Sequence, residues 1–114
     1  MSGFTRDIVL ADNADASLDF FSDAVKVSGN RGAFAQCIFT GAPTGVLYLE
    51  ASADPTNKPG DVTEWTILKD YIVSSAGSVS IDAIRVNFKW LRVAFDAAGG
   101  TGTFTARLNL RGER

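Results

Sequence analysis

The residue best suited to nucleophilic chemistry in this chain is its single cysteine, Cys37, which lies in the apolar run of residues 34–39. A reactive thiolate needs a base such as histidine beside it, and the 114 residues include no histidine. Without histidine there is no Ser-His-Asp triad and no zinc site built on imidazole. We therefore interpret Cys37 as a small buried hydrophobic residue, and we expect the protein not to be an enzyme.

Two loops carry residue types that bind ligands in other proteins. Residues 54–61 (Asp-Pro-Thr-Asn-Lys-Pro-Gly-Asp) place side-chain oxygens at Asp54, Asn57 and Asp61, and calcium prefers oxygen ligands. The spacing is not that of an EF-hand, which favours a turn that uses these residues for backbone geometry. Residues 99–102 (Gly-Gly-Thr-Gly) lack the Lys-Ser/Thr pair and the strand-to-helix context of a phosphate-binding loop. The sequence thus predicts two turns, the second a flexible hairpin turn, with no metal and no cofactor.

Aromatic residues could form a platform on which sugar rings stack. The candidates are Tyr48, Trp65, Tyr71 and Trp90. Strand alternation places Trp90 opposite the apolar set of its own strand, at the solvent-facing side or an edge. Aromatic residues are also ordinary strand formers and core residues. A carbohydrate-binding module that uses Tyr48, Trp65 and Trp90 therefore stays open as an alternative function.

The overall charge and hydropathy narrow the range of partners. The net charge of −2 argues against nucleic acid as the main partner, because phosphate binding requires a basic face. The chain contains no run of 18 apolar residues, the length needed to cross a membrane, so we expect no membrane partner. The first residues lack the basic and then apolar layout of a signal peptide, which predicts folding in the cytoplasm of the cell that makes the protein.

The charged residues are distributed unevenly along the chain. Basic residues gather in the last third, at Arg85, Lys89, Arg92, Arg107, Arg111 and Arg114. Acidic residues gather in the first quarter, at Asp7, Asp12, Asp15, Asp19 and Asp23. This asymmetry could steer one subunit against another, or it could be ordinary solvated charge.

The elements that would position these residues are predicted to be strands. Strand-like segments occupy residues 4–10, 18–27, 33–40, 46–52, 62–73 and 79–86, with residues 11–17 as a polar linker. Turn signals recur every eight to twelve residues or so, which is typical of an all-β sandwich or barrel. The only helical alternative is residues 14–25. We predict an all-β, antiparallel, jelly-roll-like β-sandwich of about eight strands in a single domain, 1–114, with residues 1–17 considered as an N-terminal arm.

The last quarter of the chain has the clearest pattern. Two alternating runs flank the glycine-rich turn and predict a β-hairpin with one buried face. The predicted core residues are Leu91, Val93, Phe95, Phe104, Ala106 and Leu108. Arg92 and Arg107 are predicted to face outward, where a neighbour could bind them. Residues 33–40 are apolar on both faces, which indicates either a covering loop or an interface with another protein.

The order of several short motifs resembles that of small β-sandwich structural proteins found on tailed-bacteriophage particles. The resemblance covers roughly residues 33–110. It is carried by residues 46–55 (Val-Leu-Tyr-Leu-Glu-Ala-Ser-Ala-Asp-Pro), 65–68 (Trp-Thr-Ile-Leu), Gly77, 90–95 (Trp-Leu-Arg-Val-Ala-Phe) and 100–108 (Gly-Thr-Gly-Thr-Phe-Thr-Ala-Arg-Leu). The chain departs from the pattern at residues 90–93 and at 97–100 (Ala-Ala-Gly-Gly). The pattern contains no catalytic residue.

The resemblance implies a virion structural protein that binds the outside of an assembled phage shell. Capsid decoration or cement is the leading role, and a fibre or receptor-binding domain is the alternative. The implied partners are the major capsid protein or other virion subunits, and the implied assembly is a homo-oligomer, a trimer. The expected contact residues lie in the N-terminal arm and the basic C-terminal part: Phe4, Arg6, Arg92, Arg107 and Arg111.

Overall fold

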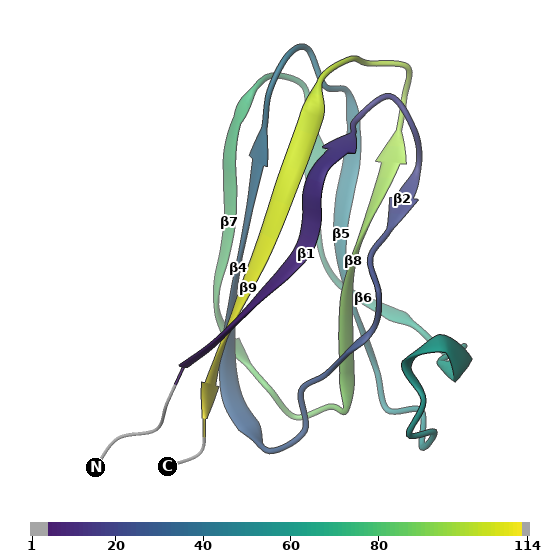
Figure 1. Ribbon diagram of the computed structural model, residues 1–114, viewed down its shortest axis with the longest axis vertical. Coiled ribbons are helices and arrows are strands. Elements are labelled where there is room, and N and C mark those ends of the chain that lie inside the picture. Colours follow the sequence, from purple (N-terminus) through teal and green to yellow (C-terminus); the bar gives the residue numbers. More distant parts are fainter. Residues whose placement is uncertain (1–4, 113–114) are drawn as a thin grey trace.

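The computed structural model of the protein describes residues 5–112, with side chains described over residues 6–80 and 85–112. Within these bounds the chain forms nine strands in two antiparallel sheets (Figure 1). Sheet A has the spatial order β1 (Thr5–Asp15), β9 (Thr103–Gly112), β4 (Asn30–Phe39) and β7 (Gly77–Arg85). In sheet B, the short strands β2 (Phe20–Phe21) and β3 (Val25–Lys26) both pair with β8 (Trp90–Ala97), which is followed by β5 (Gly45–Ser52) and β6 (Thr66–Val73).

The topology is that of a jelly roll. The chain passes from one sheet to the other at every connection except the one between β5 and β6 and the short one between β2 and β3. With β2 and β3 counted as two parts of one strand, eight strands face each other in the orders 1-9-4-7 and 2/3-8-5-6. The predicted all-β, jelly-roll-like sandwich is therefore confirmed.

The closing segment is not a hairpin. β8 belongs to sheet B and β9 to sheet A, so residues 98–102 cross between the sheets and the two strands do not pair. Period-two alternation specifies which side chains are buried, and a crossover preserves that pattern as well as a hairpin does. The predicted core is confirmed, because all six residues are at most 1% exposed: Leu91, Val93, Phe95, Phe104, Ala106 and Leu108.

The glycine-rich crossing is tightly packed rather than flexible. Thr101 N donates to Ala42 O at 3.0 Å, and Thr40 N donates to Thr103 O at 2.9 Å. Gly102 has a φ of 101°, and a Cβ on this residue would overlap the carbonyl group of Thr40. The glycines permit close approach between two loops, so the prediction of a flexible hairpin turn is wrong.

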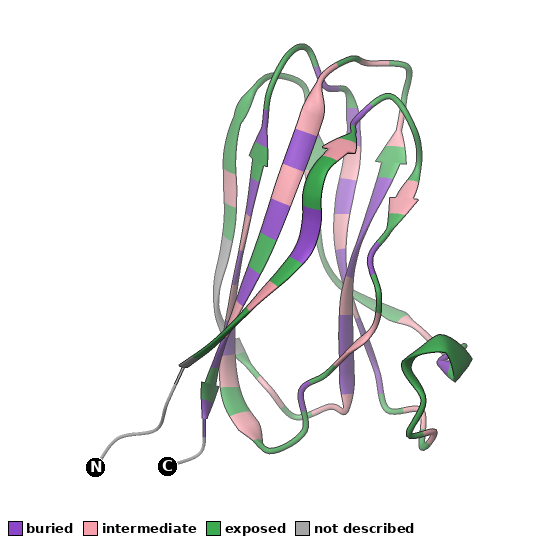
Figure 2. Cartoon of the chain, viewed as in Figure 1, coloured by how far each residue is buried: buried purple, intermediate pink, exposed green. Residues whose placement is uncertain are grey.

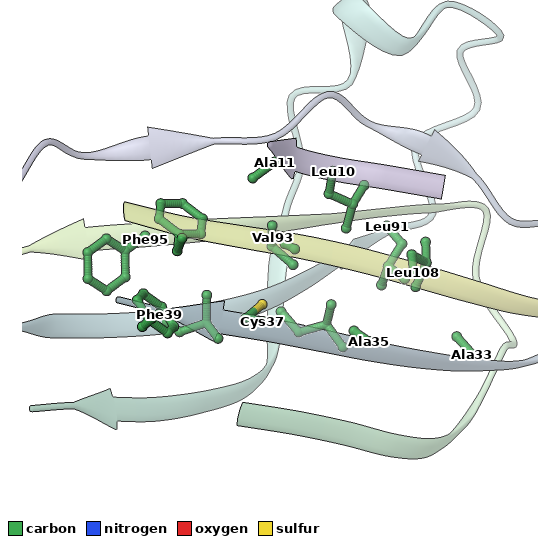
Figure 3. Packing of buried hydrophobic residues seen from close by; sticks show 14 of the residues in the cluster. Leu10, Ala11, Ala33, Ala35, Cys37, Phe39, Leu91, Val93, Phe95 and Leu108 are labelled. Carbon is green, nitrogen blue, oxygen red and sulfur yellow. The ribbon is translucent and has the colours of Figure 1, made fainter. Parts of the chain in front are cut away.

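Aromatic rings fill one end of the core between the sheets. Phe104 lies with its ring centroid 5.2 Å from that of Phe20, 5.3 Å from Phe39 and 5.5 Å from Phe95. Figure 3 shows Phe39 and Phe95 side by side at this end, with Cys37, Leu91 and Leu108 farther along the core. Buried and less buried stripes alternate along β9 in Figure 2, as expected for a strand with one face in the core.

The N-terminal segment is longer than predicted and forms part of the sheet. β1 continues to Asp15 and pairs with β9 at the edge of sheet A. The prediction of a polar linker over residues 11–17 is therefore wrong for residues 11–15, which belong to the strand. Register shifts on either side of Ala11 let the strand pass its polar residues without ending. Asn13, within the second shift, has a φ of 52°, which asparagine tolerates better than most residues.

Residues 14–25 are not helical, and β2 lies there instead, with β3 beginning at Val25. In the described part of the chain, the one helical element is a 3-10 turn, η1 (Pro59–Asp61). No helix there is long and apolar enough to cross a membrane.

Candidate functional site

The thiol of Cys37 lies inside the sandwich. The residue is 1% exposed, and it faces the core from β4 beside Ala106 of β9. Burial raises the pKa of the thiol to about 12. At neutral pH the thiol is therefore protonated, and the interpretation of Cys37 as a small buried hydrophobic residue is confirmed.

The loop at residues 53–65 is organised by Asp54. Its carboxylate accepts hydrogen bonds from the backbone N–H groups of Thr56 and Thr63, each at 3.1 Å, and these bonds lower the pKa of the Asp54 carboxyl. The side chain of Lys89 donates to Pro55 O at 3.0 Å. The interpretation of this segment as a turn built on side-chain to backbone hydrogen bonds is confirmed. Over the described residues, no group of three or more His, Cys, Asp or Glu could hold a metal ion.

Trp90 is not part of an exposed platform. It lies on the outer side of β8, as the alternation predicts, but it is only 1% exposed. Its indole N–H donates to Asp54 O at 3.2 Å, which ties the ring to the loop of residues 53–65. The prediction that Trp90 faces solvent is therefore wrong, because a loop distant in sequence covers it.

Arg92 lies at the centre of the outer face of sheet B. Its guanidinium carbon is 4.2 Å from the ring centroid of Trp65 and 4.7 Å from that of Phe21. Its Nε donates to Glu50 Oε1 at 2.6 Å, from the cross-strand position on β5. Arg92 does point outward, as predicted, but its side chain is only 21% exposed and is held by two rings and a carboxylate. We call these four residues, Phe21, Glu50, Trp65 and Arg92, the guanidinium cage.

A groove adjoins the guanidinium cage on the same face. Strand pairing places Ala94 of β8 between Phe21 of β2 and Tyr48 of β5, so two aromatic side chains flank a small one. The groove has a volume of about 230 Å³. Its lining residues are Asp19, Phe21, Tyr48, Glu50, Ala94, Phe95 and Asp96. We call this groove the aromatic slot.

The sequence identified Tyr48 but missed the other members of the aromatic slot. Phe21 reaches it only because the two-residue strand β2 pairs with β8, about seventy positions later in the chain. Asp19 is fixed beside it because its carboxylate accepts a hydrogen bond from Ala97 N at 2.9 Å. The available signal was the alternation of Tyr48 with the buried residues of β5, which marks the outward face but does not name its neighbours.

The outer face of sheet A carries a group of arginines. Arg107 lies in the middle of β9, and Arg85 and Arg111 flank Gly32 of β4 on either side. We call these three arginines the basic region. Val9, which is 58% exposed, is the cross-strand neighbour of Arg107, so an apolar side chain adjoins the charge.

The remaining predicted contact residues are not gathered at one site. Arg6 donates from Nη2 to Lys26 O at 3.0 Å, which joins the edge of sheet A to β3 of sheet B. Phe4 lies outside the described residues. Arg107 and Arg111 share the outer face of sheet A, whereas Arg92 lies on the opposite face of the sandwich.

The apolar outer face of β4 is partly explained. Phe34 is half-buried, and Ile38, which lies near the end of the interior strand β4, is 40% exposed. No loop among the described residues packs over Ile38 enough to bury it. The covering loop considered from the sequence is therefore wrong for Ile38, and the interface stays a prediction.

No protein-family model and no curated protein matches the chain. Solved structures do share its fold. The PBSX exported protein XepA matches with a TM-score of 0.71 and 12% identity over 96% of this chain, which spans 38% of the XepA chain. The SPBc2 prophage-derived protein YomS matches with a TM-score of 0.60 and 10% identity, over 98% of this chain and 96% of YomS.

A third structure with this fold is chitosan-binding module 1 of the chitosanase/glucanase from Paenibacillus sp. IK-5. It matches with a TM-score of 0.50 and 12% identity, over 95% of each chain. At these identities the likeness establishes the fold and leaves function to be argued from the surface of the chain itself.

Proposed function

We propose that this chain is a non-enzymatic structural protein of a phage particle, a decoration or cement protein that binds the outside of the assembled shell. The observation that carries the proposal is the pair of outer faces. The basic region lies on one sheet, whereas the carboxylate-lined aromatic slot lies on the other. Exposed apolar side chains lie on both, including Val9 and Ile38 on sheet A and Phe21 and Ile72 on sheet B. A subunit with neighbours on both sides would bury such surfaces.

The fold supports this role. Jelly-roll sandwiches occur in viral capsid proteins, and one solved structure with this fold is a prophage-derived protein. The proposed partner is the major capsid protein, and the proposed assembly is a trimer. The proposed location is therefore the virion, after synthesis in the host cytoplasm.

The mechanism is mass action. A protein that binds the assembled shell but not its free subunits stabilises the shell by RT ln(1 + [L]/Kd) at each site, or about 2.7 kcal/mol when its free concentration is 100 times Kd. The basic region would guide the encounter, since rim charges act mainly on the association rate and its salt dependence.

The test compares particles that contain this protein with particles that lack it. We expect the second kind to release their DNA at a lower temperature, and added protein to restore the loss. The double variant Arg107→Glu/Arg111→Glu should restore less at low salt, whereas Lys58→Glu, a charge reversal in the exposed part of the 53–65 loop, should restore fully. Equal release temperatures with and without the protein would refute the cement role.

Saccharide binding is the second candidate function, and the outer face of sheet B favours it. Tyr48, Trp65 and Phe21 all lie on this face, although Trp90 does not contribute to it. Aromatic rings beside polar groups are typical of small-ligand sites. A calorimetric titration with neutral and charged oligosaccharides tests this function, and heats no greater than those of dilution for every saccharide would refute it.

A further inference from the structure

The guanidinium cage holds a cation of the chain itself on the outer face of sheet B. The positive charge of Arg92 lies between two aromatic rings and beside the Glu50 carboxylate. Aromatic faces attract cations through their quadrupole, and a carboxylate adds a charge-assisted hydrogen bond. This part of the face is thus a cation site whose occupant is supplied by the chain itself.

The aromatic slot repeats this composition one step along the same strands. Phe21 is shared between the two sites, and Tyr48 lines the opposite wall of the slot. Asp19 and Asp96 supply two carboxylates beyond the one that pairs with Arg92. Among the residues whose side chains are described, the only ion pair within 4.0 Å is the one between Arg92 and Glu50, so no lysine or arginine neutralises Asp19 or Asp96.

The dimensions of the slot limit its occupant. Phe21 and Tyr48 lie two strand spacings apart, which is about 10 Å between their backbones. Ala94, between them, leaves the floor low. The volume of about 230 Å³ is below the roughly 300 Å³ at which pockets for drug-sized ligands begin. The slot therefore suits one small ring.

The geometry points to an amino-sugar unit as the ligand of the aromatic slot. In this arrangement the pyranose ring lies over Ala94 between Tyr48 and Phe21, and its ammonium group is directed toward Asp19 and Asp96. This inference deepens the second candidate function, saccharide binding, and rests on it. Asp19 and Asp96 are exposed carboxylates that attract a cation and only hydrogen-bond a neutral sugar, which is why the charged sugar is favoured.

The test is a calorimetric titration of the full chain at low salt with three probes of equal length. They are a glucosamine oligomer, an N-acetylglucosamine oligomer and a lysine peptide. We expect the glucosamine oligomer to bind at least tenfold more tightly than the neutral oligomer, and to weaken as salt is raised.

Variants locate the binding. Asp96→Asn should weaken binding of the glucosamine oligomer roughly 10-fold or more, because hydrogen bonds to a charged group are stronger than neutral ones. Asp61→Asn, the same change at an exposed position in η1, should have no effect. Ala94→Leu should fill the floor of the slot and abolish binding, and the retained far-UV circular dichroism of each variant would show that it folds.

The remaining outcomes are decisive as well. Equal binding of the two sugar oligomers, with loss in Ala94→Leu, would overturn the amino-sugar inference and leave saccharide binding intact. Binding of the lysine peptide alone would overturn it in favour of a protein partner. No binding of any probe would overturn the amino-sugar inference, whereas the saccharide function is refuted only if the wider set of oligosaccharides also fails to bind. If glucosamine binding is unchanged in both Asp96→Asn and Ala94→Leu, the sugar binds outside the aromatic slot and the inference is overturned.

Discussion

Replacing Phe104 should remove a large part of the stability of the sandwich. The side chain is 1% exposed, and it contacts the rings of Phe20, Phe39 and Phe95 from both sheets. Truncating a buried phenylalanine to alanine costs about 3–5 kcal/mol, and aromatic pairs contribute about 0.5–1.5 kcal/mol each beyond their buried area. With three such pairs, we expect Phe104→Ala to cost about 4–5 kcal/mol. Since the free energy of unfolding of a small domain is about 5–15 kcal/mol, the variant should be marginally stable.

The assay is urea unfolding followed by tryptophan fluorescence, for which the buried Trp90 is a suitable reporter. The matched control is Phe21→Ala, because Phe21 is 62% exposed and its specific partner is the guanidinium group of Arg92. The control should lose about 1 kcal/mol, from one cation–π contact and partial burial. A Phe104→Ala loss below about 1.5 kcal/mol, or one no greater than that of the control, would refute the account of how the two sheets pack.

Three further outcomes follow from particular contacts. Gly99→Ala and Gly102→Ala both place a side chain at positive φ, but only the side chain at residue 102 also overlaps the facing loop. Urea unfolding should therefore show Gly102→Ala to be less stable than Gly99→Ala by about 2 kcal/mol or more. Equal losses in the two variants would contradict the close approach of the loops. Burial raises the pKa of the Cys37 thiol to about 12 in the folded protein, whereas an unfolded thiol titrates near about 8.5. As pH rises between these values, the wild type should therefore lose stability relative to Cys37→Ala by up to about 1.4 kcal/mol per pH unit. Parallel profiles of stability against pH for the two proteins would contradict this expectation. Hydrogen bonds lower the pKa of the Asp54 carboxyl, so its stabilisation of the loop is complete above about pH 4 and is lost as pH falls through the pKa of the folded state. Acid, or the Asp54→Asn substitution, should therefore increase acrylamide quenching of Trp90, whose indole donates to this loop. Unchanged quenching would contradict the role of Asp54.

The sequence predicted the burial pattern well and the strand pairing poorly. Alternation identified the core residues of β8 and β9, because burial of one face is a local property of a strand. It could not distinguish a hairpin from a crossing between sheets, since both produce the same alternation. That β8 and β9 belong to different sheets is determined by the pairing of β8 with β5 and of β9 with β4, and these pairings involve residues distant in sequence.

The candidate site was predicted in part for the same reason. Arg92 was correctly predicted to face outward, and Tyr48, a candidate for the aromatic platform, also lies on an outward face, because each alternates with buried neighbours. The stacking of Arg92 on Phe21 and Trp65 depends on three segments that meet only in the folded chain. The burial of Trp90 depends on a loop whose course is set by the Asp54 hydrogen bonds, and composition alone does not give that course.

The most direct test of the structural role is an electron cryo-microscopy reconstruction of particles that contain this protein. We predict density for the jelly roll on the outside of the shell, in trimers, with the basic region of Arg85, Arg107 and Arg111 against a neighbouring subunit. Treatment with high salt should reduce the occupancy of this density, because exposed charges are screened beyond about 10 Å at 0.1 M ionic strength. Particles without this density, or with the protein confined to the tail, would contradict the account.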